Sequence, residues 1–216
     1  MKKALFSFAS LVCLSGCSVF GVRSEENPKY DVLVKDEKFE VRQYHPYIVA
    51  TTFVEGSFEE TQNKAFRILA GYIFGDNEKD SKISMTAPVV MNPPKNESEK
   101  IAMTAPVTQA PKGNGWEMSF MMPSKYKSIE ELPKPKDSRV TFRVLEPKLE
   151  AVILFTGFWS EEKNQKMASQ LREWLAKNAQ YEPLSEPKFA GYDPPWTLPF
   201  LRRNEILIEV KKVSSR

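Results

Sequence analysis

A strand, a glycine and a capped amphipathic helix follow one another twice in this sequence, and few folds accommodate such a repeat. The first copy begins with a β-type segment at 47–54, after which Gly56 interrupts the alternation of apolar and polar residues. Ser57 and Glu60 form a capping box, which predicts a helix that ends near Gly75. Its apolar residues follow roughly one stripe, made of Phe58, Ala65, Phe66, Leu69, Tyr72 and Ile73.

The second copy begins with a β-type segment at 150–156 and is interrupted by Gly157. Ser160 can cap the helix that follows, whose apolar residues are Met167, Leu171, Trp174 and Leu175. Further β-type segments lie at 30–34, 39–44, 82–91, 100–107, 116–122, 188–192 and 205–213. We therefore predict an α+β fold, in which two similar halves share one antiparallel sheet or barrel with one helix per half outside it. The Pro-, Lys- and Ser-rich segment 123–135 is interpreted as a surface connection.

A shorter repeat follows the first predicted helix. The sequence Lys-Ile-Ser-Met-Thr-Ala-Pro-Val at 82–89 recurs as Lys-Ile-Ala-Met-Thr-Ala-Pro-Val at 100–107. Both copies alternate as strands do, but Pro88 and Pro106 cannot donate to a ladder and are expected at bulges or edges. Taken alone, the repeat indicates strand-and-bend architecture.

The N-terminus has the pattern of a bacterial export signal. Lys2 and Lys3 precede an uncharged run at 4–14, which is shorter than the roughly 20 residues of a membrane span. The run ends in Leu-Ser-Gly-Cys, which resembles the lipobox of bacterial lipoproteins and implies cleavage before Cys17 and acylation of its thiol. The absence of Asp at Ser18 implies the outer membrane, facing the periplasm. The alternative is an ordinary secretory signal that leaves Cys17 free.

These signals divide the chain into a signal peptide at 1–16, a lipidated tether at 17–29 and a single domain at 30–213. Cys13 lies in the predicted signal peptide and the thiol of Cys17 is expected to be acylated, so no disulfide is expected in the domain. Removing Lys2 and Lys3 reduces the 31 basic residues to 29 against 28 acidic ones, a net charge of +1. A nucleic-acid partner is therefore not expected, and nothing in the sequence indicates the oligomeric state.

Four segments together resemble the SOUL haem-binding protein family. They are Phe-Glu-Val-Arg-Gln-Tyr at 39–44, Ala-Phe-Arg-Ile-Leu-Ala-Gly-Tyr-Ile at 65–73, the repeat copy at 82–89, and Tyr-Asp-Pro-Pro-Trp-Thr-Leu-Pro-Phe-Leu-Arg-Arg-Asn-Glu at 192–205. The resemblance covers about 29–213. It implies a distorted antiparallel β-barrel flanked by two helices with an internal pseudo-two-fold repeat. It also implies that haem or another tetrapyrrole binds in an apolar groove, and it brings no shared catalytic machinery.

Histidine and methionine are the candidate iron ligands. His45 is the one histidine in the sequence, so a bis-histidine site is excluded within one chain, and His45 is a possible axial ligand. The alternative is an exposed turn histidine beside Pro46. Met85 is a second candidate, within a group that also includes Met103, Met118, Met121 and Met122. Trp116, Met118, Phe120 and Met122 would share one strand face, which favours a core role over iron or copper(I) binding.

Arginines are the candidates for pairing with haem propionates, because guanidinium groups bind carboxylates in bidentate fashion. We single out Arg42, Arg67, Arg202 and Arg203, with Trp196 as an aromatic neighbour of the last two. The alternative is a structural corner in which an arginine pairs with Glu205 or a carbonyl.

The sequence thus predicts a membrane-anchored periplasmic protein that binds haem or a related tetrapyrrole, and no enzyme. No Gly-x-Ser-x-Gly, His-Glu-x-x-His or Gly-x-x-x-x-Gly-Lys motif is present. Two alternatives remain: an envelope lipoprotein that binds a protein or lipid partner, and, less favoured, a small-molecule hydrolase that uses the barrel groove.

Overall fold

The computed structural model describes residues 25–78, 98–194 and 196–213. The predicted signal, Cys17, and the first repeat copy with Met85 lie outside these residues. The helices are α1 (Phe58–Phe74) and α2 (Glu161–Lys177), with short 3-10 helices η1 (Ile129–Glu131) and η2 (Pro199–Leu201). The strands are β1 (Tyr30–Asp36), β2 (Phe39–Tyr44), β3 (Tyr47–Glu55), β4 (Asn77–Glu78), β5 (Val107–Lys112), β6 (Gly115–Met121), β7 (Lys134–Pro135), β8 (Thr141–Leu145), β9 (Lys148–Phe155), β10 (Tyr181–Pro183), β11 (Lys188–Gly191) and β12 (Asn204–Lys212).

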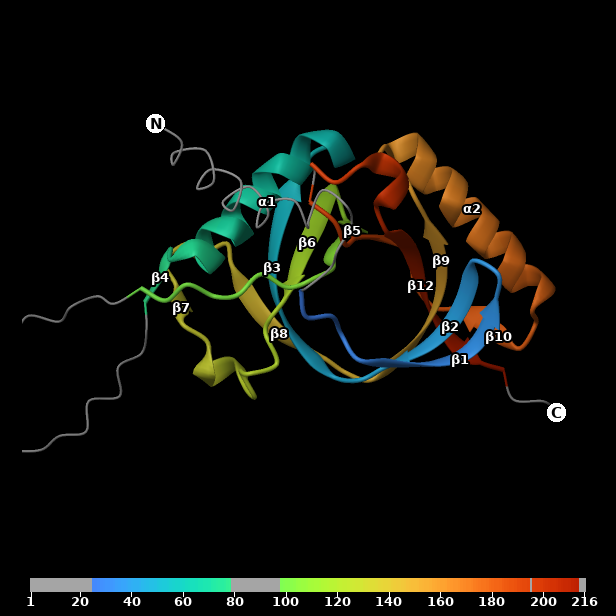
Figure 1. The fold of residues 1–216 in the computed structure, drawn as a ribbon, viewed down its shortest axis with the longest axis horizontal. Helices are drawn as coiled ribbons and strands as arrows, with labels where there is room; N and C mark the ends of the chain where they lie inside the picture. The colour runs from blue at the N-terminus through green and yellow to red at the C-terminus, as the bar shows by residue number, and fades with distance from the viewer. Residues whose placement is uncertain (1–24, 79–97, 195, 214–216) are drawn as a thin grey trace, which may run out of the picture.

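Ten of the described strands form one antiparallel sheet in the order β1-β2-β9-β12-β11-β5-β6-β3-β8, with β10 added beside β12. The sheet curls into a half-barrel, and both helices lie on its outer face (Figure 1). Strands β4 and β7 form a separate pair. The predicted α+β barrel with two flanking helices is confirmed. No helix among the described residues is both long enough and apolar enough to cross a bilayer.

The order of the strands is symmetric about its centre, which confirms the predicted internal repeat. The first half consists of β2, β3, α1, β5 and β6, and the second half repeats it as β8, β9, α2, β11 and β12. Strand β3 pairs with β6 as β9 pairs with β12, and β5 meets β11 at the pseudo-two-fold axis. The halves differ most in one connection. A two-residue turn joins β5 to β6, whereas the loop 192–203 joins β11 to β12.

Both helices begin where the capping residues predict. The Ser57 hydroxyl accepts from the Glu60 backbone N–H, and the Glu60 carboxylate accepts from the Ser57 N–H at 3.0 Å. Gly75 ends α1 with a φ of 121°, a conformation that favours glycine. At α2, the Ser160 hydroxyl accepts from the Lys163 backbone N–H. Local sequence therefore sets the ends of both helices.

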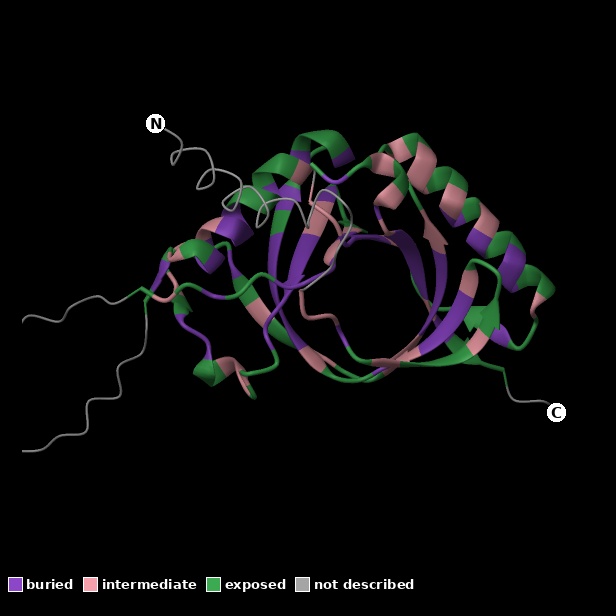
Figure 2. Ribbon diagram, in the orientation of Figure 1, coloured by how far each residue is buried: buried purple, intermediate pink, exposed green. Residues whose placement is uncertain are grey.

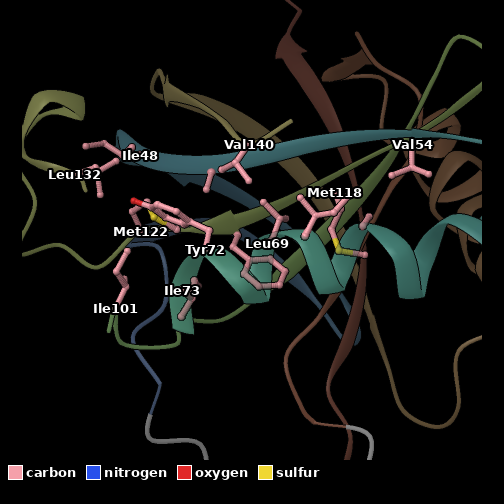
Figure 3. Close-up of a cluster of buried hydrophobic side chains, with 14 residues drawn as sticks. Ile48, Val54, Leu69, Tyr72, Ile73, Ile101, Met118, Met122, Leu132 and Val140 are labelled. Atoms are coloured by element: carbon pink, nitrogen blue, oxygen red, sulfur yellow. The ribbon is translucent and has the colours of Figure 1, made fainter. Parts of the chain in front are cut away.

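Each helix covers its own apolar core on the outer face of the sheet, where buried residues line the strands (Figure 2). Under α1, Leu69, Tyr72 and Ile73 pack against Met118 and Met122 (Figure 3). The two methionines are 1% and 2% exposed, so the predicted core role is confirmed. Phe66 was expected on the buried stripe, but it is 40% exposed, although its ring still meets Phe120 of β6 at 5.5 Å.

The segment 100–107 does not form the predicted strand. Only Val107 belongs to a strand, and Thr104 makes an isolated bridge to Glu26. Instead, the segment runs from the core under α1, where Ile101 packs, to the inside of the curled sheet, where Ala105 packs against Tyr44 and Tyr192. The end of the predicted tether lies alongside this segment, because the Ala105 N–H donates to the Glu26 carbonyl at 3.0 Å. Residues 25–29 are therefore bonded to the domain.

Candidate functional site

A cleft of about 460 Å³ opens where the two halves meet. It lies beside α2, over the junction of β5 and β11, and the first turns of α1 and α2 lie near one another there (Figure 1). Its described lining residues come from both halves and from both helices: Phe58, Pro111, Trp116, Glu161, Asn164, Gln165, Ala168, Ser169, Arg172, Glu186, Pro187, Lys188, Phe189 and Ile206. We call this the interhelical cleft.

Aromatic rings make up much of the cleft wall. The Phe58 ring meets Trp116 edge-on with centroids 5.1 Å apart, and it lies 6.4 Å from Phe189. Phe189 in turn contacts Trp159, just outside the cleft, at 4.2 Å. A Cβ at Gly191 would lie 1.9 Å from the Trp159 ring, so only glycine allows this indole to pack so close to the sheet. Phe58 and Phe189 are only 2% and 3% exposed, so the half-buried Trp116 is the aromatic side chain that the wall offers to a ligand.

Two polar features of the cleft stand out. At its rim, the Arg172 guanidinium pairs with the Glu186 carboxylate at 2.7 Å, and both side chains are largely exposed, at 51% and 74%. The side-chain oxygen of Asn164 is buried and has no hydrogen-bond partner. Because buried polar atoms are nearly always paired, this amide indicates a polar group of a ligand or a water in the cleft.

An aromatic corner adjoins the cleft through Trp159. Phe158, Trp196 and Phe200 are 64%, 64% and 68% exposed there. The loop 192–203 is held against the end of β9, since the Gly157 N–H donates to the Pro199 carbonyl at 2.8 Å. Arg202 lies within the corner, 4.8 Å from the centre of the Phe158 ring, and its Nε donates to the Thr197 carbonyl. The corner occurs in only one half, where the other half has a tight turn.

Arg42, a predicted propionate ligand, is fully buried on the face of the sheet opposite α2. Its guanidinium donates to Glu205 at 2.9 and 3.0 Å, to Glu40 at 2.7 Å and to Tyr44 at 3.0 Å. Burial opposes the charged form, but Glu205 outweighs it and raises the pKa of Arg42 above its ordinary value. Arg42 therefore has a structural role, and its contact with a propionate stays a prediction that this burial and pairing do not favour.

Glu205 also binds Arg203, whose Nε donates to it at 2.9 Å, and the Tyr192 hydroxyl at 2.6 Å. The alternative of an arginine paired with Glu205 thus holds for Arg203. Trp196 and Arg202 lie in the aromatic corner, and Arg67 is exposed on α1. None of these residues lines the interhelical cleft, so their contact with a ligand stays a prediction.

A second buried charged group lies on the same face as Arg42. The Glu150 carboxylate, 1% exposed, pairs with Lys188 and with Lys148, the latter at 3.0 Å. Burial alone would raise the pKa of Glu150, but the two ammonium groups reverse the shift and hold it below its ordinary 4.5. The paired carboxylate therefore stabilises the fold above pH 4.5, and this stability is lost as the pH falls through the lowered pKa.

Glu150→Gln should accordingly make the free energy of unfolding depend less on pH below neutrality. Urea unfolding from near pH 7 to about pH 3 should show wild type losing more stability than the variant, because only wild type must protonate this buried carboxylate. The two free energies of unfolding should converge as the pH falls. A difference between the two free energies of unfolding that stays constant over this pH range would contradict the role given to Glu150.

His45 lies in the turn between β2 and β3, where its Nε2 is 2.8 Å from the Asp31 carboxylate. Its side chain is 51% exposed and does not line the cleft. Iron ligation by His45 stays a prediction from sequence, and the position of the cleft favours a haem site without His45.

His45→Ala should therefore leave the absorption spectrum of bound ferric haem unchanged. A shifted Soret band in this variant would instead place the iron at the β2–β3 turn.

Among the described residues, no group of three or more His, Cys, Asp or Glu side chains is arranged to hold a metal ion. The described residues that line the cleft include no His, Cys or Met. The site as described therefore offers one half-buried tryptophan, one exposed guanidinium and one unpaired amide oxygen, rather than a ligand set for iron.

The comparisons with known proteins agree with the fold. The family model described as SOUL heme-binding protein matches residues 25–209, which is most of the chain. The chain belongs to the SOUL heme-binding protein family. Among relatives, Heme-binding protein 1 of Xenopus tropicalis is 29% identical over 194 residues, covering 88% of this chain and 93% of the relative. Heme-binding protein 2 of Mus musculus is 29% identical over 191 residues, covering 86% and 84%.

Solved structures share the fold of this SOUL-family chain at low identity. The crystal structure of the EcmrR C-terminal domain has a TM-score of 0.55 at 14% identity and covers 85% of this chain and 99% of that one. A structure of an uncharacterized conserved protein from Listeria innocua also gives 0.55, at 13% identity, with 82% and 94% covered. These likenesses show the fold alone.

Sequence reasoning missed the cleft residues of this SOUL-family chain. The available signal was on α2, where Asn164, Ala168 and Arg172 recur at four-residue spacing and therefore share one helix face. Ala168 and Ser169 are small, which leaves room between the helix and the strands below. Such a face is ordinary in an amphipathic helix, and only its position opposite Phe189 and Trp116 in the folded chain shows that it borders a cleft.

Proposed function

We propose that this chain binds haem or a related tetrapyrrole in the interhelical cleft, and that it does so as a lipid-anchored protein of the bacterial cell envelope. The observation that carries the binding is the family match over residues 25–209, together with relatives named as heme-binding proteins. The cleft supplies a place for the ligand. The proposed location in the cell envelope rests on the lipobox-like sequence that ends at Cys17.

The cleft residues fit a tetrapyrrole in size and chemistry. Ligand pockets typically measure 300–1,000 Å³, and the cleft, at about 460 Å³, lies within this range. Trp116 would contact the ring above the nearly buried Phe58 and Phe189, and Arg172 would pair with a carboxylate. Haem would bring an iron centre with it, but the described lining residues bind only its ring and edge. Metal-free protoporphyrin should therefore bind about as well as haem.

A titration tests this proposal. The domain from residue 25 onward contains every described helix and strand, and it should be titrated with hemin and with metal-free protoporphyrin. We expect saturable binding of both, with dissociation constants within about tenfold of one another, since neither depends on iron ligation here. Binding of neither compound would overturn the proposal. Binding of hemin alone would show that the iron is ligated and that the ligand lies elsewhere.

Membrane attachment is tested separately. Wild-type protein expressed in bacteria should incorporate labelled fatty acid and fractionate with the outer membrane. Cys17→Ser should lose the label and the membrane association, because stable anchoring depends on the acyl chains. Unlabelled, soluble wild-type protein would instead support an ordinary secretory signal with a free Cys17.

One observation favours a second function, an interaction with an envelope partner. Phe158, Trp196 and Phe200 expose large aromatic surfaces on two adjacent loops, and such surfaces often mark interfaces. If neither tetrapyrrole binds in the titration, the second function can be tested by crosslinking the tethered protein in cells. A variant that replaces these three residues by serine should lose any partner that the wild type captures.

A further inference from the structure

The interhelical cleft has one arginine at its rim, and that arginine is already occupied by a carboxylate of the chain itself. Arg172 lies on α2, and its partner Glu186 lies in the connection from β10 to β11. The other cation in the described lining is Lys188, whose ammonium is committed to the buried Glu150. A ligand carboxylate that enters the cleft therefore has Arg172 as its available guanidinium, and it meets Glu186 there.

The Arg172–Glu186 pair can be exchanged at little cost. Both side chains are largely exposed, and ion pairs between exposed groups contribute little to stability. If Glu186 is displaced, its carboxylate can return to water without any buried group losing a partner. A ligand carboxylate beside an apolar wall, by contrast, is shielded from water on one side and pairs more strongly with the guanidinium. The geometry thus favours replacement of Glu186 by a bound carboxylate.

We propose that Arg172 binds a carboxylate of the tetrapyrrole and that Glu186 is a built-in competitor for the same guanidinium. The unpaired side-chain oxygen of Asn164, on the same face of α2 two turns earlier, can accept a hydrogen bond from an N–H or O–H of the ligand. This inference rests on the proposed function and narrows it, because it makes the preferred ligand a tetrapyrrole that carries carboxylates. Removing the competitor should tighten binding, and removing the guanidinium should weaken it.

The test compares two ligands that share one ring: metal-free protoporphyrin and its dimethyl ester, whose carboxylates are neutralised. Glu186→Gln should bind protoporphyrin about three- to tenfold more tightly, and Arg172→Gln about tenfold or more weakly, the range expected for one charge-assisted pair. Neither change should alter binding of the diester. Glu182→Gln is the matched control, since Glu182 forms a similarly exposed pair with Lys211, away from the cleft.

The outcomes separate this inference from the proposed function. If wild type binds protoporphyrin but Arg172→Gln and Glu186→Gln leave the affinity unchanged, the inference is overturned and the proposed function stands. Equal weakening for protoporphyrin and the diester would show that Arg172 acts through packing, which also overturns it. If wild type binds neither ligand, both proposals fail. Arg172→Lys keeps the charge and should recover part of the affinity, which guards against a folding defect in Arg172→Gln.

Discussion

Replacing Glu205 by alanine should lower the free energy of unfolding by about 3–5 kcal/mol, the usual cost of breaking a buried ion pair by removing one partner. The Glu205 side chain is completely buried and accepts from Arg42, Arg203 and the Tyr192 hydroxyl. Without it, Glu40 is the carboxylate among the described residues that still pairs with the buried Arg42. The protein must then hold a poorly compensated charge in its interior, which is costly.

Urea unfolding of wild type and Glu205→Ala measures this loss directly. The matched control is Glu182→Ala, which removes the carboxylate of an exposed pair with Lys211, and exposed pairs are worth about 0–1 kcal/mol. We expect the Glu205 variant to unfold at much lower urea, with the control close to wild type. A loss at Glu205 no larger than that of the control would contradict the structural role of the buried network.

The second large effect concerns ligand binding. Ser169→Trp should weaken binding of protoporphyrin by at least about tenfold, because the indole would occupy space that the ring needs. Ser169 is exposed on α2 and lines the cleft, so the larger side chain can be added without disturbing the core beneath Leu171. The variant should therefore fold normally and yet bind poorly.

Lys166→Trp provides the control for this prediction. Lys166 is exposed on the same helix but does not line the cleft, so a tryptophan there adds the same bulk elsewhere. Fluorescence titration of the two variants, together with their circular dichroism, separates occlusion of the cleft from a folding defect. Equal affinities in the two variants would show that the ligand does not occupy the cleft.

The sequence correctly predicted the features of the fold that depend on residues close together in the chain. The caps at Ser57 and Ser160 and the end of α1 at Gly75 depend on neighbours within a few residues, and all three are confirmed. The segment 100–107 alternates like a strand, yet it passes from the core under α1 at Ile101 to the inside of the sheet at Ala105. That difference depends on the curl of the whole sheet, which no window of this length can show.

The candidate site was harder to predict than the fold. Arg42 looked like a propionate ligand until its pairing with Glu205, 163 residues away, showed that it is buried and occupied. The cleft itself is built from separate elements: Phe58 on α1, Trp116 on β6, Phe189 on β11 and Arg172 on α2. Their proximity follows from the pairing of β5 with β11, a contact that the repeat suggests but does not specify.

The pseudo-two-fold repeat also indicates where function lies. Strands and helices that serve the fold occur in both halves, whereas the loop 192–203 occurs in one. This loop carries the exposed Trp196 and Phe200 and adjoins the cleft through Trp159. Because a symmetric scaffold alone does not require this loop, its aromatic residues are candidates for a functional role.

The most direct test of tetrapyrrole binding in the interhelical cleft uses the four tryptophans of the chain as positional reporters. Their indole N–H signals can be followed by NMR while ¹⁵N-labelled protein is titrated with metal-free protoporphyrin. The signal of Trp116, which lines the cleft, should shift strongly, and that of Trp159, which contacts Phe189, should shift less. Trp174, whose indole donates to Asp36 at 2.7 Å outside the cleft, should not move. Saturable binding that leaves Trp116 unchanged would contradict the account.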